Sequence, residues 1–186
     1  MNRLLSFGWS PRTRRATFAI GLAGFLALGF SATAALGGGG GISTGSDSDG
    51  AGAVFPVRAP HAYGDGLGAG RGHQGQDILA ECGKRIVAAR SGRVRVKDYQ
   101  ASGAGNFVVV RRAGKGTDDV YMHMKRRVAV REGERVEPGD LIGRVGSTGR
   151  STACHLHFEI WSTPGWYEGG DPRDPEPKLR RWDRKD

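Results

Sequence analysis

His155-Leu156-His157-Phe158-Glu159 carries the clearest structural pattern in this chain. Polar and apolar residues alternate in it, with the period of a β-strand that buries one face. On such a strand both imidazoles project from one face, whereas Leu156 and Phe158 point into a core. The stretch therefore predicts a strand whose two histidines either share a metal ion or divide catalytic work between them.

Short β-rich runs, separated by Gly-rich and charged turns, lead up to this strand. The predicted strands are Ile86–Ala89, Arg93–Val96, Phe107–Arg111, Val120–His123, Leu141–Val145 and His155–Trp161. Helical periodicity is nearly absent. Strands at this close spacing predict an all-β fold, a compact antiparallel sandwich or barrel-like sheet, rather than βαβ units.

A second group of candidate ligands stands upstream, at His73 and Asp77. On a straight strand these residues would lie about 13 Å apart, too far to bind one ion. The backbone must therefore bend between them. Gly72 and Gly75 permit that bend and argue against a helix.

The types of these residues point to zinc. His73, Asp77 and one histidine of the later strand supply two nitrogens and one oxygen, which suits Zn²⁺ with a fourth position left for water. A structural zinc site would be closed by four ligands and would usually include thiolates, but Cys82 and Cys154 lie far from these spacings. The remaining histidines can accept a proton or stabilise an oxyanion.

Four blocks of sequence together resemble one family. They are Gly70-Arg71-x-His73-x-Gly75-x-Asp77, Tyr121-x-His123, the glycine-punctuated segment 133–149, and His155-Leu156-His157-Phe158-Glu159. Their order and separation are similar to those of the lysostaphin and LytM-type zinc endopeptidases, which cleave peptides of bacterial peptidoglycan. The resemblance covers roughly residues 54–161.

The resemblance implies a site and a fold. It implies one Zn²⁺ ion on His73, Asp77 and His157, with His123 and His155 as catalytic residues. It also implies a small all-β domain with a groove for an extended peptide of the cell wall, and it places Gly105-Asn106 and the loop 146–149 near that groove. Tyr121 is expected to pack beneath the site. Glu159 either orients an imidazole or is simply exposed.

Two other functions fit parts of the sequence. A non-catalytic protein could use the same groove to bind wall peptides or to activate another hydrolase, but relatives of that kind lack the zinc ligands. A glycan-cleaving enzyme would need paired carboxylates, and no Asp/Glu pair has a comparable setting. Among cross-links, D-alanine to diaminopimelate is favoured over glycyl bridges, because the chain shows no separate wall-targeting module.

The ends of the chain predict export and a short tail. Four arginines and an apolar run precede Ala32-Thr33-Ala34, so residues 1–34 are expected to be a signal peptide or, uncleaved, a membrane anchor facing outward. Residues 35–53 form a Gly/Ser-rich linker, 54–170 the peptidase domain and 171–186 a Pro- and charge-rich tail. The basic segment Lys178–Lys185 is expected to be a solvated end, and His61 a loop residue without catalytic work.

Charge and cysteine content set further bounds. The formal net charge of +9 falls to +5, from 24 basic and 19 acidic residues, if cleavage follows Ala34. No basic stripe with interleaved aromatic residues suggests nucleic-acid binding, and a monomer is expected. Cys82 and Cys154 could form a disulfide or stay free. Cys154 and Lys84-Arg85 depart from the family, which usually has Pro and Thr-Pro there.

Overall fold

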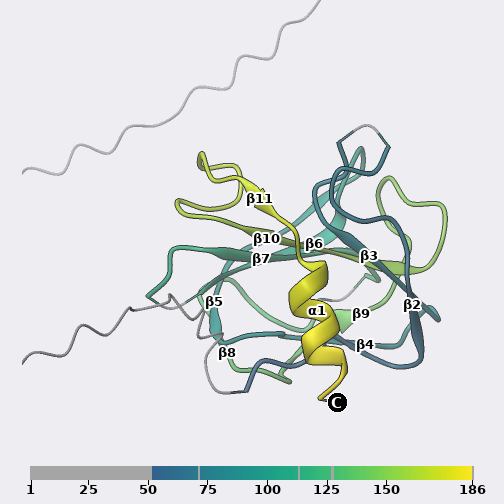
Figure 1. The fold of residues 1–186 in the computed structure, drawn as a ribbon, viewed down its shortest axis with the longest axis horizontal. Helices are drawn as coiled ribbons and strands as arrows, with labels where there is room; N and C mark the ends of the chain where they lie inside the picture. Colours follow the sequence, from purple (N-terminus) through teal and green to yellow (C-terminus); the bar gives the residue numbers. More distant parts are fainter. Residues whose placement is uncertain (1–51, 71, 113, 127, 186) are drawn as a thin grey trace, which may run out of the picture. The chain divides into compact units, whose positions relative to one another are not determined.

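Two antiparallel β-sheets account for most of the regular structure, and the strand that carries His155 and His157 lies inside the larger one (Figure 1). The computed structural model describes residues 52–185, except residues 71, 113 and 127. The predicted signal peptide at 1–34 and nearly all of the predicted linker at 35–53 lie outside the described residues. No helix among the described residues is both long and apolar enough to cross a membrane.

The larger sheet is built around β10. Its strands, in spatial order, are β2 (His61–Tyr63), β3 (Gln76–Ala80), β10 (His155–Trp161), β7 (Asp118–Met124), β6 (Gly105–Arg112), β5 (Gly92–Gln100) and β8 (Arg135–Val136), with β11 (Pro172–Arg173) paired to β10. The smaller sheet contains β1 (Val57–Arg58), β4 (Arg85–Val87) and β9 (Leu141–Arg144). Each predicted strand corresponds to one of these, and the all-β prediction is confirmed.

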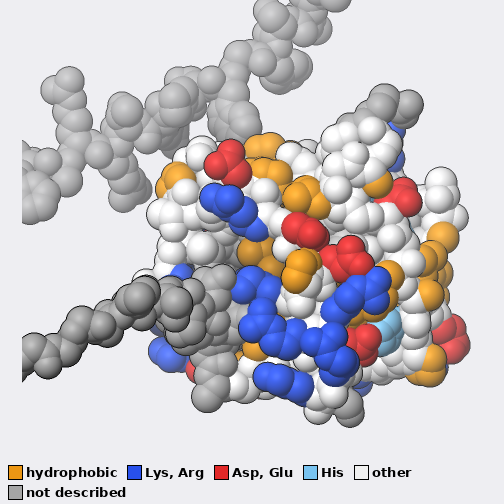
Figure 2. Space-filling view, viewed as in Figure 1, with side chains coloured by type: hydrophobic (Ala, Val, Ile, Leu, Met, Phe, Trp, Pro, Cys, Tyr) orange, Lys and Arg blue, Asp and Glu red, His pale blue; other side chains and the backbone are white. Residues whose placement is uncertain are grey.

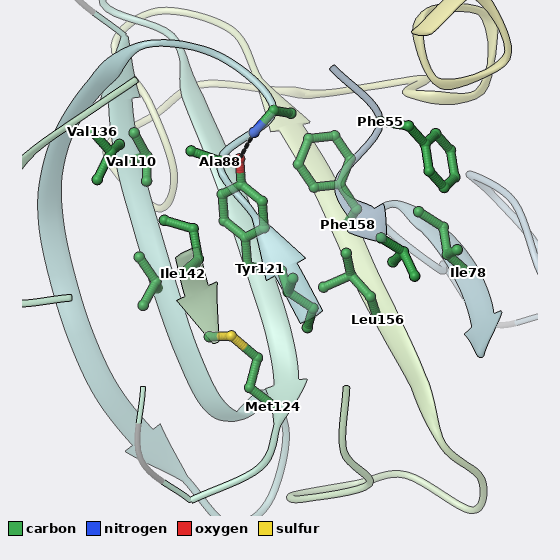
Figure 3. Packing of buried hydrophobic residues seen from close by; sticks show 14 of the residues in the cluster. Phe55, Ile78, Ala88, Val110, Tyr121, Met124, Val136, Ile142, Leu156 and Phe158 are labelled. Atoms are coloured by element: carbon green, nitrogen blue, oxygen red, sulfur yellow. Dashed lines mark hydrogen bonds between the residues drawn. The ribbon is translucent and has the colours of Figure 1, made fainter. Parts of the chain in front are cut away.

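The main core lies between the two sheets. Leu156 and Phe158 of β10 are fully buried there, together with Ile142 of the small sheet (Figure 3). Tyr121 is also buried, and its hydroxyl accepts a hydrogen bond from the backbone N–H of Ala89 over 2.9 Å. Tyr121 thus packs in the main core, beneath the sheet face that carries His157, as expected.

The other face of the large sheet carries a second, smaller apolar cluster. It contains Ala104, Phe107, Val109, Val120, Met122 and Trp161, and Trp166 packs against it. Residues on this face alternate along each strand with residues of the main core. This second face is the one to which His157 and Glu159 belong, so the candidate site is built on the sheet surface that faces away from the main core.

The C-terminal segment corrects one prediction. Residues Glu176–Asp183 form helix α1, which buries Leu179 and Trp182 against the main core. Its outer side is basic, and Lys and Arg side chains gather where α1 lies (Figure 2). The expectation of a solvated end was therefore wrong, because two apolar residues three positions apart give the segment a face to bury.

The two cysteines are joined. The Cys82–Cys154 disulfide links positions 72 residues apart in sequence. It connects the turn after β3 to the residue immediately before His155. The loop that feeds β10, where the family pattern has proline, is thereby tied to the rest of the fold.

Candidate metal centre

Adjacent strands bring three of the predicted ligands together. Asp77 on β3 and His157 on β10 are direct partners in the antiparallel register, so their side chains project from the same face. His73 lies in the loop before β3. One ligand atom from each of these three residues lies within 4.8 Å of the other two, in a cluster with the geometry of a possible metal site.

Asp77 occupies the middle of the cluster. Its Oδ1 atom lies 3.1 Å from Nε2 of His73, 2.8 Å from Nδ1 of His157 and 3.5 Å from Nε2 of His155. Burial acts to raise the pKa of Asp77, but the hydrogen bond from His157 and the nearby histidines outweigh it and lower the pKa. The carboxylate is therefore held in its ionised form, as a metal ligand must be.

The second nitrogen of each ligand histidine is already occupied. Nδ1 of His73 lies 2.9 Å from the carbonyl oxygen of Gly66, and Nε2 of His157 lies 2.9 Å from Oε1 of Glu159. A carbonyl oxygen and a carboxylate oxygen accept hydrogen bonds, so these nitrogens are the donors. The remaining nitrogens, Nε2 of His73 and Nδ1 of His157, are thus the ones turned towards Asp77.

His157 shows how a cation would fit. Burial acts to lower its pKa, but the hydrogen bonds to Asp77 and Glu159 prevail and raise the pKa to about 9. The two carboxylates thus favour a positive charge at the imidazole. A metal ion bound at Nδ1 would supply that charge in place of the proton. Two imidazole nitrogens and one carboxylate oxygen form a donor set that suits zinc.

Glycines allow the approach of His73 to Asp77. Gly72 adopts φ +83°, a conformation that a side chain would strain. At Gly75, a Cβ atom would lie 2.3 Å from the carbonyl oxygen of Phe158 and 3.0 Å from Nε2 of His157. The predicted bend between the two ligands is confirmed, and its second glycine also makes room for the neighbouring strand.

Glu159 is buried rather than exposed, with a relative exposure of 2%. Besides holding His157, it accepts a hydrogen bond from Nε1 of Trp161 over 2.6 Å. Of the two expectations for this residue, orientation of an imidazole is the one that the structure shows.

His123 reaches the groove through an unusual backbone conformation. Along β7, Val120 and Met122 face the groove side, whereas Tyr121 and Met124 face the main core. Strict alternation would turn His123 into the core, but its φ of +61° breaks the alternation. Its side chain therefore joins Met122 on the groove side.

A carbonyl fixes the tautomer of His123. Its Nδ1 atom lies 2.8 Å from the carbonyl oxygen of Thr148, so Nδ1 carries the proton and Nε2 is free. Burial lowers the pKa of His123 to about 4. The imidazole is consequently neutral near pH 7.

His155 is held in a similar way. Its Nδ1 atom lies 2.9 Å from the carbonyl oxygen of Ala153, which leaves Nε2 to face Asp77. Its ring centroid is 4.7 Å from that of His123. The two histidines without a ligand role thus form a pair beside the candidate metal centre.

All five predicted site residues line one groove of about 820 Å³. Of the two glycine loops expected near the groove, Gly149 lines it; Gly105-Asn106 do not, although the preceding residues Gly103 and Ala104 do. His61 does not line the groove. It lies in β2, and its Nε2 atom is 3.3 Å from Oδ2 of Asp183 of α1.

Sequence reasoning missed much of the groove wall. Arg150, Trp166 and Tyr167 line it, and Tyr167 is 70% exposed. The loop that carries the two aromatic residues is anchored where the buried carboxylate of Asp118 accepts the backbone N–H of Trp166 over 2.8 Å. Irregular loop segments have no period from which such positions could be predicted.

Comparison with known proteins identifies a family that this chain matches. Residues 71–175 match the model of peptidase family M23. A peptidoglycan DD-endopeptidase, ShyC of Vibrio cholerae, is 40% identical over 90 residues, which are 48% of this chain and 20% of that protein. This chain spans less than half the length of the curated relatives that it matches, from 18% to 43%.

Solved structures are similar as well. The catalytic domain of lysostaphin from Staphylococcus simulans superposes with a TM-score of 0.58 at 31% identity, over 64% of this chain and 92% of that one. A zinc-containing peptidase from Vibrio cholerae gives a TM-score of 0.54 at 26% identity, over 64% of this chain and 37% of that one.

Proposed function

Because this chain belongs to peptidase family M23, we propose that it is a zinc endopeptidase that hydrolyses peptide cross-links of bacterial peptidoglycan. The observation that carries the proposal is the cluster of His73, Asp77 and His157, with two further histidines beside it in one groove. A site that served only to hold a structural metal would have no use for that pair.

One Zn²⁺ ion would be held by Nε2 of His73, Oδ1 of Asp77 and Nδ1 of His157, because these three atoms converge. The other ring nitrogen of each histidine is hydrogen-bonded away from the metal position, to Gly66 and to Glu159. Zinc bound there supplies a Lewis acid that polarises the scissile carbonyl and makes water acidic enough to react near neutral pH. The chain's own residues then have to orient the peptide and move protons.

His155 is proposed as the general base. Its Nδ1–H is held by the carbonyl of Ala153, so Nε2 presents a lone pair, and Nε2 lies 3.5 Å from the carboxylate of Asp77. That carboxylate stabilises the imidazolium which forms when His155 accepts the proton of the attacking water.

His123 is proposed to stabilise the oxyanion, with one condition that the structure adds. Since Nδ1–H is committed to the carbonyl of Thr148, His123 donates from Nε2 only when the ring carries both protons. Burial opposes that charge in the free enzyme and lowers the pKa to about 4. A developing negative charge on the substrate favours it, so the hydrogen bond strengthens as the oxyanion forms.

The proposed substrate is an extended stem peptide lying in the groove. We propose the D-alanine to diaminopimelate bond as its target, in line with the name of the relative that is 40% identical. The chain would act as a monomer outside the cytoplasm, in the periplasm or the cell wall. Residues 1–34 would direct its export and, if they stay uncleaved, tether it to the membrane.

Variants of the two paired histidines test the proposal. His155→Ala and His123→Ala should each lose nearly all release of new amino termini from purified peptidoglycan while keeping the zinc content of the parent. His61→Gln, outside the groove, is the control and should retain turnover. Full activity in either groove variant would overturn the assigned role; zinc binding without turnover in the parent protein would instead indicate a wall-binding regulator.

A further inference from the structure

We infer that Arg150 is a specificity residue that binds a free carboxylate of the substrate peptide next to the bond that is cut. This inference rests on the proposed function and extends it to the chemical class of peptide that the groove accepts. It would make the enzyme select acidic wall peptides over neutral glycyl bridges.

Arg150 is the one lysine or arginine that lines the groove among the residues described in the structure. Its side chain is exposed, and it forms no hydrogen bond or ion pair with any described residue. By contrast, Arg95 and Arg111 of the large sheet both bind the buried carboxylate of Asp118. An unpaired guanidinium facing a peptide groove is placed to bind an anion of the substrate.

The acidic residues of the groove do not neutralise Arg150. Asp77 is surrounded by three histidines, and both oxygens of Glu159 are committed to His157 and Trp161. The third acidic residue of the lining, Asp65, forms no ion pair with Arg150. The positive charge of Arg150 therefore remains available to a ligand.

The backbone that carries Arg150 is held in place. Its N–H donates to the carbonyl of Gly103 over 2.8 Å. A Cβ atom at the preceding residue, Gly149, would lie 2.2 Å from the backbone nitrogen of Gly105, so the two loops are in close contact. Two residues earlier, the carbonyl of Thr148 accepts Nδ1–H of His123. Arg150 thus lies on the same loop that positions a proposed catalytic residue.

The chemistry of the cross-links differs at this point. In a D-alanine to diaminopimelate cross-link, the carbon that bears the amide nitrogen also bears a carboxylate. A glycyl bridge has no charged group beside its peptide bonds. A bidentate pair between a guanidinium and a carboxylate combines charge with fixed geometry, so it discriminates strongly between these two substrates.

A pair of matched substrates tests the inference. One is a cross-linked peptide dimer with the free carboxylate beside the scissile bond, and the other is the same dimer with that carboxylate converted to an amide. The parent enzyme should cleave the first with a kcat/KM about 10- to 100-fold higher. Arg150→Gln should lose that preference, because its kcat/KM should fall for the dimer with the free carboxylate and stay unchanged for the amide. Arg150→Lys should keep part of the preference. Arg131→Gln, an exposed arginine outside the groove, is the control and should keep the full preference.

The possible outcomes separate the two proposals. If the parent cleaves both dimers and Arg150→Gln keeps the original ratio of kcat/KM values, the role of Arg150 is wrong while the endopeptidase stands. If the zinc-loaded parent cleaves neither dimer nor whole peptidoglycan, the proposed function itself fails.

Discussion

The Nε2 atom of His157 lies 2.9 Å from Oε1 of Glu159, a carboxylate that is almost fully buried beside it. This contact turns Nδ1 of His157 towards Asp77 and selects the tautomer that can bind a metal. Partners of this kind typically change metal affinity by about 10- to 100-fold.

Replacement of Glu159 should therefore weaken zinc binding without removing a ligand. We expect Glu159→Ala to lower zinc affinity by about 10- to 100-fold, measured by competition with a chelator, and Glu159→Gln to lose less because it keeps an acceptor oxygen. Trp161→Phe, which removes the other hydrogen bond of Glu159 and keeps an aromatic ring in the cluster, is the control. Unchanged affinity in Glu159→Ala would show that Glu159 does not orient His157.

Thr148 should matter for turnover more than for metal binding. Its Oγ1 donates to the carbonyl of Met124 over 2.8 Å and accepts the N–H of Asn106 over 2.9 Å, and this holds the carbonyl that fixes His123. Thr148→Val keeps the shape and removes both bonds. We expect kcat to fall about 10-fold with KM and zinc content nearly unchanged. Thr148→Ser should restore most of the rate; a rate equal to the parent in Thr148→Val would argue against this support.

The Cys82–Cys154 disulfide should contribute both stability and activity. A bridge closing a loop of 72 residues is worth about 4 kcal/mol in the chain-entropy model. We expect the double variant Cys82→Ser, Cys154→Ser to unfold at a clearly lower denaturant concentration. Because Cys154 directly precedes His155, kcat of the folded variant should also fall. A reductant should affect the parent in the same way and leave the double variant unchanged.

Helix α1 should be part of the stable domain. Trp182 is 1% exposed and packs against the main core, so Trp182→Ala should cost about 3 to 5 kcal/mol of the free energy of unfolding. The exposed Lys185→Ala should change it by less than about 0.5 kcal/mol. Equal unfolding midpoints for the two variants would mean that the helix is dispensable.

Period and spacing explain what could be predicted from the sequence. The alternation in residues 155–159 predicts both the buried face of β10 and the common side of its two histidines, and glycines flanking His73 predict the bend. Local patterns of this kind depend on backbone geometry, so they can be read from the sequence where the strand stays regular.

Other features depend on contacts between distant segments. Helix α1 has only Leu179 and Trp182 to mark a buried face within a Pro-rich, charged segment, too few positions to show a helical period. The backbone of His123, in its left-handed conformation, hydrogen-bonds to Ala104 and Thr148, which lie on two loops distant in the sequence. The buried Glu159 accepts Nε1–H of Trp161 and lies close to Gly75 of the neighbouring segment. Arg150 and Tyr167 lie on loops, and loop residues follow no periodic pattern from which their positions could be predicted.

The most direct test is the release of new amino termini from purified peptidoglycan by the zinc-loaded domain, before and after treatment with a chelator and after zinc is added back. A zinc endopeptidase on His73, Asp77 and His157 releases amino termini, stops when the metal is removed and recovers when zinc returns, whereas Asp77→Ala stays inactive throughout. Release that persists in the chelator, or in Asp77→Ala, would contradict the metal centre. Complete absence of release by the folded, zinc-loaded domain would contradict the enzyme.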